Sequence, residues 1–139
     1  MNTLIFSQAV VAHLHQAGWT IERRIEIKHY VQALEAVGYT VFPVVYTFLT
    51  SFGGLDIGYT LEFNPTDFAD NIHPDNVTAY QTIINSRICV IGVWQQMTLV
   101  MDQRGQVFAG FGRELWFCGI SGIDAIERLL THADIRKLN

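Results

Sequence analysis

Residues 97–119 read Met-Thr-Leu-Val-Met-Asp-Gln-Arg-Gly-Gln-Val-Phe-Ala-Gly-Phe-Gly-Arg-Glu-Leu-Trp-Phe-Cys-Gly, a pattern typical of three short strands joined by two tight turns. We expect antiparallel strands at 97–101, 106–109 and 114–118. Apolar side chains fall on both faces of this predicted meander, whereas a sheet with one wet face would alternate cleanly between apolar and polar residues. Both faces are therefore expected to be covered, unless part of one face is left for a partner.

The two turns of this stretch contain residues suited to tight turns. Asp102 opens the first turn, where its carboxylate can accept backbone N–H groups, and Gly105 can adopt the positive φ that strains other residues. Residues 110–112 are expected to form the second turn. Asp102 and Gly105 are therefore predicted to have structural roles.

The composition predicts one apolar domain spanning residues 1–139. Hydrophobic residues make up 50% of the chain and charged residues only 16%, against roughly a quarter charged in ordinary globular domains. No apolar run approaches the ~18 residues of a membrane span, and the N-terminus lacks the basic region of a signal peptide. We expect a cytoplasmic protein that does not bind membranes, with Cys89 and Cys118 as buried, reduced thiols.

The N-terminal residues have the apolar spacing of a helix. This helix is expected over 3–17, with Thr3 as its N-cap and Gly18 as the left-handed residue that ends it. Trp19 follows at a position where an apolar side chain usually packs back on the last turn. Trp19 is therefore assigned to the core.

Two further helices are predicted before residue 55. One begins at Thr20 or nearer Glu26 and is closed by Gly38. Pro43 opens the next, because proline is tolerated at the first helical position. The pair Gly53-Gly54 ends it and is expected to have a structural role.

The hydrophobic period changes to two over residues 55–63, which predicts one strand or two short ones with Tyr59 on the dry face. Residues 66–76 are irregular and acidic. Asp75 or Asn76 is expected to cap the short helix that follows.

The remaining segments complete the predicted order of elements. Residues 88–91 form a buried strand, and residues 92–96 form a loop that contains Trp94. Ser121 starts the last helix, and the polar residues 132–139 are expected to fray. Trp94 lies between turn residues, so it is a candidate contact for a partner, although core packing remains open.

Charge is distributed unevenly along the chain, whose net charge is −4. No Lys or Arg occurs between Lys28 and Arg87. Nucleic-acid binding requires the opposite sign, because phosphates must be neutralised. An acidic zone indicates a basic protein partner, or else a solvated loop that keeps an apolar protein soluble. Between Ala36 and Ser86, this zone contains five carboxylates: Asp56, Glu62, Asp67, Asp70 and Asp75.

No catalytic constellation is evident in the sequence. The loop that holds Asp67, Asp70, His73 and Asp75 could in principle bind a hard cation or supply a general acid and base. It lacks the ligand order of a Ca²⁺ loop and the glycine that turns such a loop. We therefore expect no enzyme, no metal and no cofactor, with a small hydrolase using this loop as the less favoured alternative.

Several motifs, taken in order, resemble the SUKH superfamily of immunity proteins, and are most similar to its third family. The sequence departs from the family pattern at Ile21 and Val90, where proline is usual, and at Val93, where an acidic residue is usual. The resemblance covers roughly residues 17–130. It is carried by residues 18–24 (Gly-Trp-Thr-Ile-Glu-Arg-Arg), Phe48-Leu49, 52–55 (Phe-Gly-Gly-Leu), Ile91-Gly92, Met101-Asp102, 105–108 (Gly-Gln-Val-Phe) and Gly119.

The resemblance implies an α+β fold, in which helices pack on a single, mainly antiparallel sheet. It also implies a bacterial cytoplasmic protein that binds and blocks a cognate toxin domain, often a nuclease or deaminase of a polymorphic toxin system. The expected mechanism is stoichiometric binding by a monomer or weak dimer, in which the acidic zone attracts a basic toxin and Trp94 is an anchor. A general scaffold or regulatory binding module is the alternative.

Overall fold

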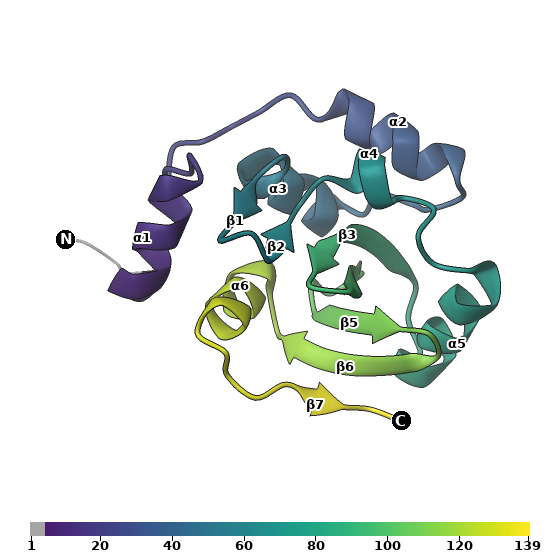
Figure 1. The fold of residues 1–139 in the computed structure, drawn as a ribbon. Coiled ribbons are helices and arrows are strands. Elements are labelled where there is room, and N and C mark those ends of the chain that lie inside the picture. Colours follow the sequence, from purple (N-terminus) through teal and green to yellow (C-terminus); the bar gives the residue numbers. More distant parts are fainter. Residues whose placement is uncertain (1–4) are drawn as a thin grey trace.

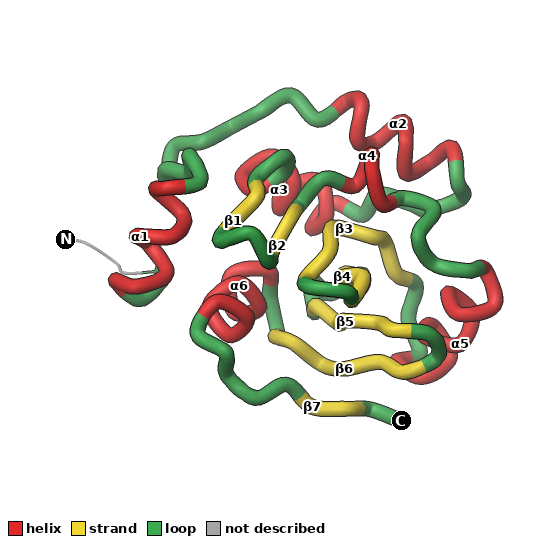
Figure 2. The backbone as a smooth tube through the Cα atoms, in the orientation of Figure 1, coloured by secondary structure: helices red, strands yellow, loops and turns green. Residues whose placement is uncertain are grey.

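The computed structural model describes residues 5–139 and confirms the α+β fold (Figure 1; Figure 2). Within those residues, six helices accompany a seven-stranded antiparallel sheet whose strand order follows the sequence. The helices are α1 (Gln8–Gln16), α2 (Lys28–Ala36), α3 (Pro43–Phe52), α4 (Pro65–Phe68), α5 (Pro74–Ile84) and α6 (Gly122–Leu130). The strands are β1 (Asp56–Ile57), β2 (Leu61–Glu62), β3 (Ile88–Trp94), β4 (Met97–Asp102), β5 (Val107–Phe111), β6 (Glu114–Gly119) and β7 (Arg136–Lys137).

The predicted meander is the centre of the sheet. β4 pairs with β5 and β5 with β6, each antiparallel, and β3 joins the other side of β4. The register shifts between Val90 and Gly92 and again between Val107 and Phe108. Such bulges bend and twist the strands, which accords with the curled sheet seen in Figure 2.

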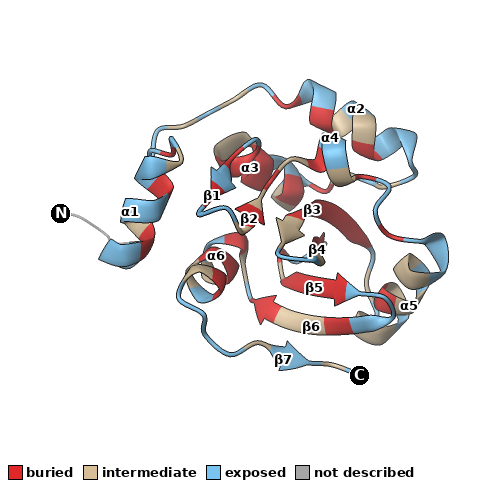
Figure 3. Ribbon diagram, viewed as in Figure 1, coloured by how far each residue is buried: buried red, intermediate tan, exposed pale blue. Residues whose placement is uncertain are grey.

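Both faces of the central sheet are covered, as the sequence predicts. On one face, Leu99 of β4 and Val107 of β5 border the same small space as Phe48 of α3 and Ala125 of α6. On the other face, the Tyr80 ring of α5 lies directly over Gly110. Figure 3 shows buried residues concentrated in β3, β5 and α3, with β7 exposed.

The glycine and proline signals are confirmed in the structure. Pro43 is the first residue of α3, and Gly18 and Gly38 follow their helices with φ of 103° and 97°. Gly105 has a φ of 91° in the turn after Asp102. Trp19 is buried in the core.

Two helix starts differ from the predictions, and a third agrees with one of its two predicted positions. α1 begins at Gln8, where Ser7 Oγ accepts the Val10 N–H at 3.4 Å, and the predicted cap Thr3 lies outside the described residues. α2 begins at Lys28, which agrees with the predicted start nearer Glu26 and excludes a start at Thr20. α5 is capped by His73, whose Nδ1 accepts the Asp75 N–H at 3.1 Å, so neither Asp75 nor Asn76 is the cap. At α1 and α5 a polar side chain caps the helix at a position that the apolar spacing alone does not mark.

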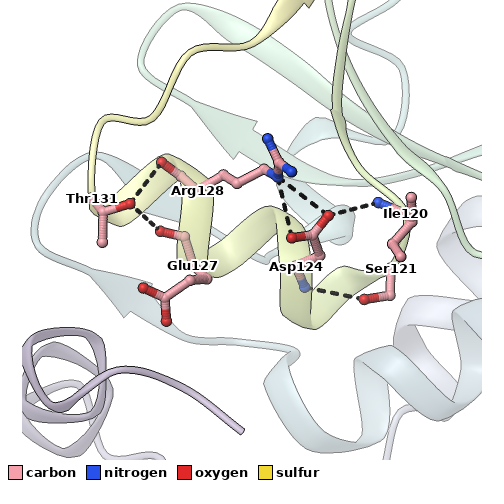
Figure 4. Close-up of polar contacts among 6 residues, drawn as sticks. All are labelled: Ile120, Ser121, Asp124, Glu127, Arg128 and Thr131. Atoms are coloured by element: carbon pink, nitrogen blue, oxygen red, sulfur yellow. Dashed lines mark hydrogen bonds and ion pairs between the residues drawn. The ribbon is translucent and has the colours of Figure 1, made fainter.

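The last helix begins where it was predicted (Figure 4). Ser121 Oγ accepts the Asp124 N–H at 3.1 Å, and the Asp124 carboxylate accepts the Ile120 N–H at 3.0 Å. Arg128 Nε then pairs with Asp124 Oδ1 at 3.1 Å along the helix. These contacts fix the start of α6 against the end of β6.

The region from Leu55 to Phe63 forms two short strands, the second of the two predicted arrangements. β1 and β2 are joined by a tight turn. Tyr59 does not lie on a dry face, which corrects the prediction. It sits in the turn with a φ of 62° and is 96% exposed, because the chain reverses before the alternating pattern is complete.

Three further predictions about the sheet are wrong. Gly92 and Trp94 belong to β3 rather than to a loop, and Gly110 belongs to β5, so the second turn of the meander lies beyond it. The C-terminal tail contributes β7, which pairs with β6 instead of fraying. Lys137 Nζ lies 3.1 Å from the Glu114 carboxylate, and the Asn139 side chain accepts the Leu115 N–H at 3.0 Å.

Candidate partner-binding surface

The five predicted acidic residues come from successive elements of the fold. Glu62 is half-buried and the other four side chains are exposed. Figure 1 shows the β1–β2 hairpin, α4 and α5 at separate places around the central sheet, so the structure does not gather the carboxylates at one point. Asp56 and Glu62 lie on the hairpin, Asp67 on α4, Asp70 in the segment after α4, and Asp75 in the first turn of α5.

Two of these carboxylates face each other directly. Asp56 of β1 is the register partner of Glu62 of β2. Like charges at directly opposed positions destabilise a strand pair. No Lys or Arg within residues 5–139 forms a salt bridge with any of the five predicted carboxylates. The hairpin therefore places two acidic residues at opposed positions without a Lys or Arg counter-ion among the described residues.

Tyr59 projects from the same hairpin. Its 96% exposure is the highest among the large apolar residues that the structure describes as exposed. Tyrosine is enriched among the residues that dominate binding energy at protein interfaces. The sequence signal for this turn is Gly58, which has a φ of 62° and interrupts the alternating pattern just before Tyr59.

Trp94 is less accessible than its predicted loop position suggests. It lies at the end of β3, is half-buried, and packs against the core. Its partner in register is Leu61 of β2, so it borders the acidic hairpin. The buried indole N–H has no hydrogen-bond partner in the part of the chain that the structure describes.

The acidic loop that could have served a hydrolase is committed to local structure. Asn64 Nδ2 donates to Asp67 Oδ2 at 3.2 Å, and the His73 ring caps α5. Among residues 5–139, no three His, Cys, Asp or Glu side chains are grouped so that they could hold a metal ion. The polar side chains of the loop therefore hold its local backbone, and they do not form a set of metal ligands among the described residues.

Both cysteines are free and buried. Burial raises the pKa of the Cys89 thiol to about 12 and that of the Cys118 thiol to about 12, because the interior disfavours the charged thiolate. Neither thiol is therefore prepared to act as a nucleophile near neutral pH.

A family model described as SUKH-3 immunity protein matches residues 6–132. The chain belongs to this family. Membership implies a bacterial immunity protein that binds a toxin. No curated protein and no solved structure matches this SUKH-3 chain. Within residues 5–139, no helix has the length and apolar character needed to cross a membrane.

Motif residues of this SUKH-3 protein hold the end of α3. Arg23 donates to the backbone carbonyls of Ser51 and Gly53 at 2.6 and 2.8 Å, which places a cation at the negative end of the helix. Trp19 Nε1 donates to Ser51 Oγ at 3.1 Å. A Cβ on Gly53 would lie 2.6 Å from the Leu49 carbonyl oxygen, and Gly54 has a φ of 82°, so both glycines are required by the backbone.

Proposed function

We propose that this protein neutralises one cognate toxin domain by stoichiometric binding in the bacterial cytoplasm, without catalysis. The toxin is a basic nuclease or deaminase of a polymorphic toxin system. The observations that support this proposal are membership of the SUKH-3 immunity family and a set of five carboxylates, four of them exposed, that lie at separate places around the sheet. We refer to these five, Asp56, Glu62, Asp67, Asp70 and Asp75, together as the acidic surface.

Charge gives this proposal its physical basis. A toxin that acts on nucleic acid must present Lys and Arg to phosphates, because their neutralisation supplies most of the binding free energy. The acidic surface offers carboxylates to the same side chains, and no Lys or Arg occurs between Lys28 and Arg87 in the sequence. In the fold, Arg87 borders the same hollow as Asp70, so the other four carboxylates contribute most to the attraction. Long-range attraction of this kind acts mainly on the association rate.

The β1–β2 hairpin supplies the short-range contacts in this proposal. A toxin cation that binds between Asp56 and Glu62 relieves their mutual repulsion. Tyr59 at the tip of the hairpin is the aromatic anchor that slows dissociation. Trp94 borders the hairpin through Leu61 and contributes the exposed part of its ring.

Association kinetics with the cognate toxin domain test the proposal. The variant Asp67→Lys, Asp70→Lys, Asp75→Lys is expected to associate at least about tenfold more slowly at low salt, with little change in dissociation. This difference should shrink as ionic strength rises, because the Debye length falls to about 8 Å at physiological salt.

A matched control separates local charge from net charge. The variant Glu22→Lys, Glu35→Lys, Asp134→Lys changes three other exposed carboxylates and has the same net charge. It should associate much faster than the first variant. Equal association rates for the two variants would mean that only net charge matters, and an unchanged rate in the first variant would place the binding surface elsewhere.

A further inference from the structure

An apolar groove does not share residues with the acidic surface, and the charged residues that line it are cations. It has a volume of about 580 Å³ and is bordered by Ile5 and Phe6, the loop after α1, one side of α3, the β4–β5 turn and the start of α6. Its size is within the range of about 300–1,000 Å³ that is typical of ligand pockets. None of the five carboxylates of the acidic surface lines it.

The floor of the groove is a rigid aromatic cluster. The Trp19 ring stacks on Phe52 with centroids 5.5 Å apart, and Phe6 meets Trp19 edge to face at 5.6 Å. Phe48 stacks on Phe52 at 5.0 Å. All four rings are buried, at exposures of 3 to 7%. The groove therefore has a preformed base, which lowers the ordering cost of binding.

The walls of the groove carry large apolar side chains that remain in water. Ile5, Ile21, Tyr46 and Ile123 are 40, 54, 51 and 37% exposed, and all four line the same space. Single exposed apolar residues need no explanation, but a contiguous group marks an interaction site. These four residues are the largest group of exposed, large apolar side chains that the structure describes around one cavity.

The charged residues that line the groove are both cations. Arg24 and Arg104 border it, and no Asp or Glu does. Neither guanidinium lies in a salt bridge within residues 5–139. Arg24 donates to the Arg23 carbonyl at 3.0 Å, which leaves the remaining donors of its guanidinium available. A ligand with apolar groups and a carboxylate would match both the walls and the rim.

We propose that this groove binds a segment of the toxin that carries apolar side chains next to at least one carboxylate. The inference rests on the proposed function for the identity of the partner. Arg24 and Arg104 select the carboxylate by bidentate pairing, and the apolar side chains bury against Ile21, Tyr46 and Ile123. In this arrangement the acidic surface raises the association rate of the toxin, and the groove lowers its dissociation rate.

A selection that needs no toxin tests the chemistry of the groove. Random short peptides displayed on phage are selected on the wild-type protein. The enriched peptides should contain Asp or Glu beside aliphatic or aromatic residues, and should bind the variant Arg24→Glu, Arg104→Glu at least about tenfold more weakly. The matched control Lys28→Glu, Arg113→Glu has the same net charge and alters exposed cations outside the groove, so it should retain binding.

Three results would overturn the inference. The first is the absence of enriched peptides, and the second is equal binding of the peptides to the groove variant and the wild type. The third is a wild-type dimer in sedimentation velocity that Arg24→Glu, Arg104→Glu dissociates, because the groove would then hold a second copy of this chain. Urea unfolding of both charge variants checks that the fold is intact.

Dissociation of the toxin domain separates this inference from the proposed function. Arg24→Glu, Arg104→Glu and, independently, Ile21→Asp should raise the dissociation rate constant at least about tenfold, with Lys28→Glu, Arg113→Glu unchanged. If the toxin binds the wild type and the groove variants equally well, the groove inference fails while the proposed function stands. If no toxin binds the wild type, the proposed function fails, and the peptide selection still decides whether the groove takes acidic apolar segments.

Discussion

The Asp102 carboxylate accepts the backbone N–H of Arg104 at 2.9 Å and so positions Arg104 at the rim of the apolar groove. The same oxygen accepts the Gln106 N–H at 2.9 Å, and the Asp102 side chain is almost completely buried. Gly105 completes the turn with a positive φ, and its Cα is so close to Val44 that a Cβ would lie 2.9 Å from a methyl group. The turn that organises the central meander therefore also shapes the groove.

Replacing Asp102 should lower stability substantially. Asp102→Ala leaves two backbone N–H groups without their acceptor in a partly buried turn, and we expect a loss of about 2–3 kcal/mol in the free energy of unfolding. Asp102→Asn keeps one oxygen acceptor and should lose less. Urea unfolding measures both, and a variant Asp102→Ala as stable as the wild type would show that the turn is held by other contacts.

Neutralising Asp56 should have opposite effects on stability and on binding. Asp56→Asn removes the repulsion with Glu62 across the hairpin, so the free protein should gain roughly 0.2–0.5 kcal/mol. Toxin affinity should fall, because a carboxylate of the binding surface is lost. The exposed Asp134→Asn is the control and should change neither quantity. A variant Asp56→Asn that binds as tightly as the wild type would remove the hairpin from the proposed interface.

Adding a methyl group at Gly110 should disrupt the contact between α5 and the sheet. A Cβ there would lie 2.6 Å from the Tyr80 ring, whose hydroxyl donates to the Gly112 carbonyl. We expect Gly110→Ala to cost about 1–3 kcal/mol, the usual cost of overpacking. In a Tyr80→Ala background the same substitution should cost much less. Equal costs in the two backgrounds, measured by thermal unfolding, would contradict this account of Gly110.

The buried thiols predict a loss of stability at high pH. Burial raises the pKa of Cys89 and of Cys118 to about 12 in the folded protein, whereas an unfolded thiol titrates near ~8.5. The unfolded state therefore binds fewer protons between these values, and stability should fall as pH rises through that window, by roughly 1.4 kcal/mol per pH unit for each thiol. The urea concentration at the unfolding midpoint should fall less steeply with rising pH for the double variant Cys89→Ala, Cys118→Ala than for the wild type. Equal slopes for the two proteins would refute the effect.

The elements that the sequence predicted best have strong local signals. Pro43 and the glycines after α1, α2 and α3 mark chain positions where few other residues fit, so their roles follow from the residue type alone. The meander was predictable because its turns contain Asp102 and Gly105 and its strands are rich in β-formers. These signals need no knowledge of distant residues.

The errors arise where distant contacts override a local signal. Gly110 looked like a turn residue, but it is a strand residue that leaves room for Tyr80, which is far away in the sequence. β7 consists of Arg136 and Lys137, and pairs with β6 without any apolar pattern that could reveal a strand. The groove brings together residues from five separate segments, so no motif could have predicted it.

The most direct test of the account is a titration of the toxin's own activity. A fixed concentration of the cognate toxin domain, well above the dissociation constant of the complex, is mixed with increasing amounts of this protein. If the protein is a stoichiometric inhibitor, activity should fall linearly and vanish at one molar equivalent, with intact toxin recovered after denaturation of the complex. Full activity at a large excess would contradict the immunity role, and complete loss far below one equivalent would contradict binding without catalysis.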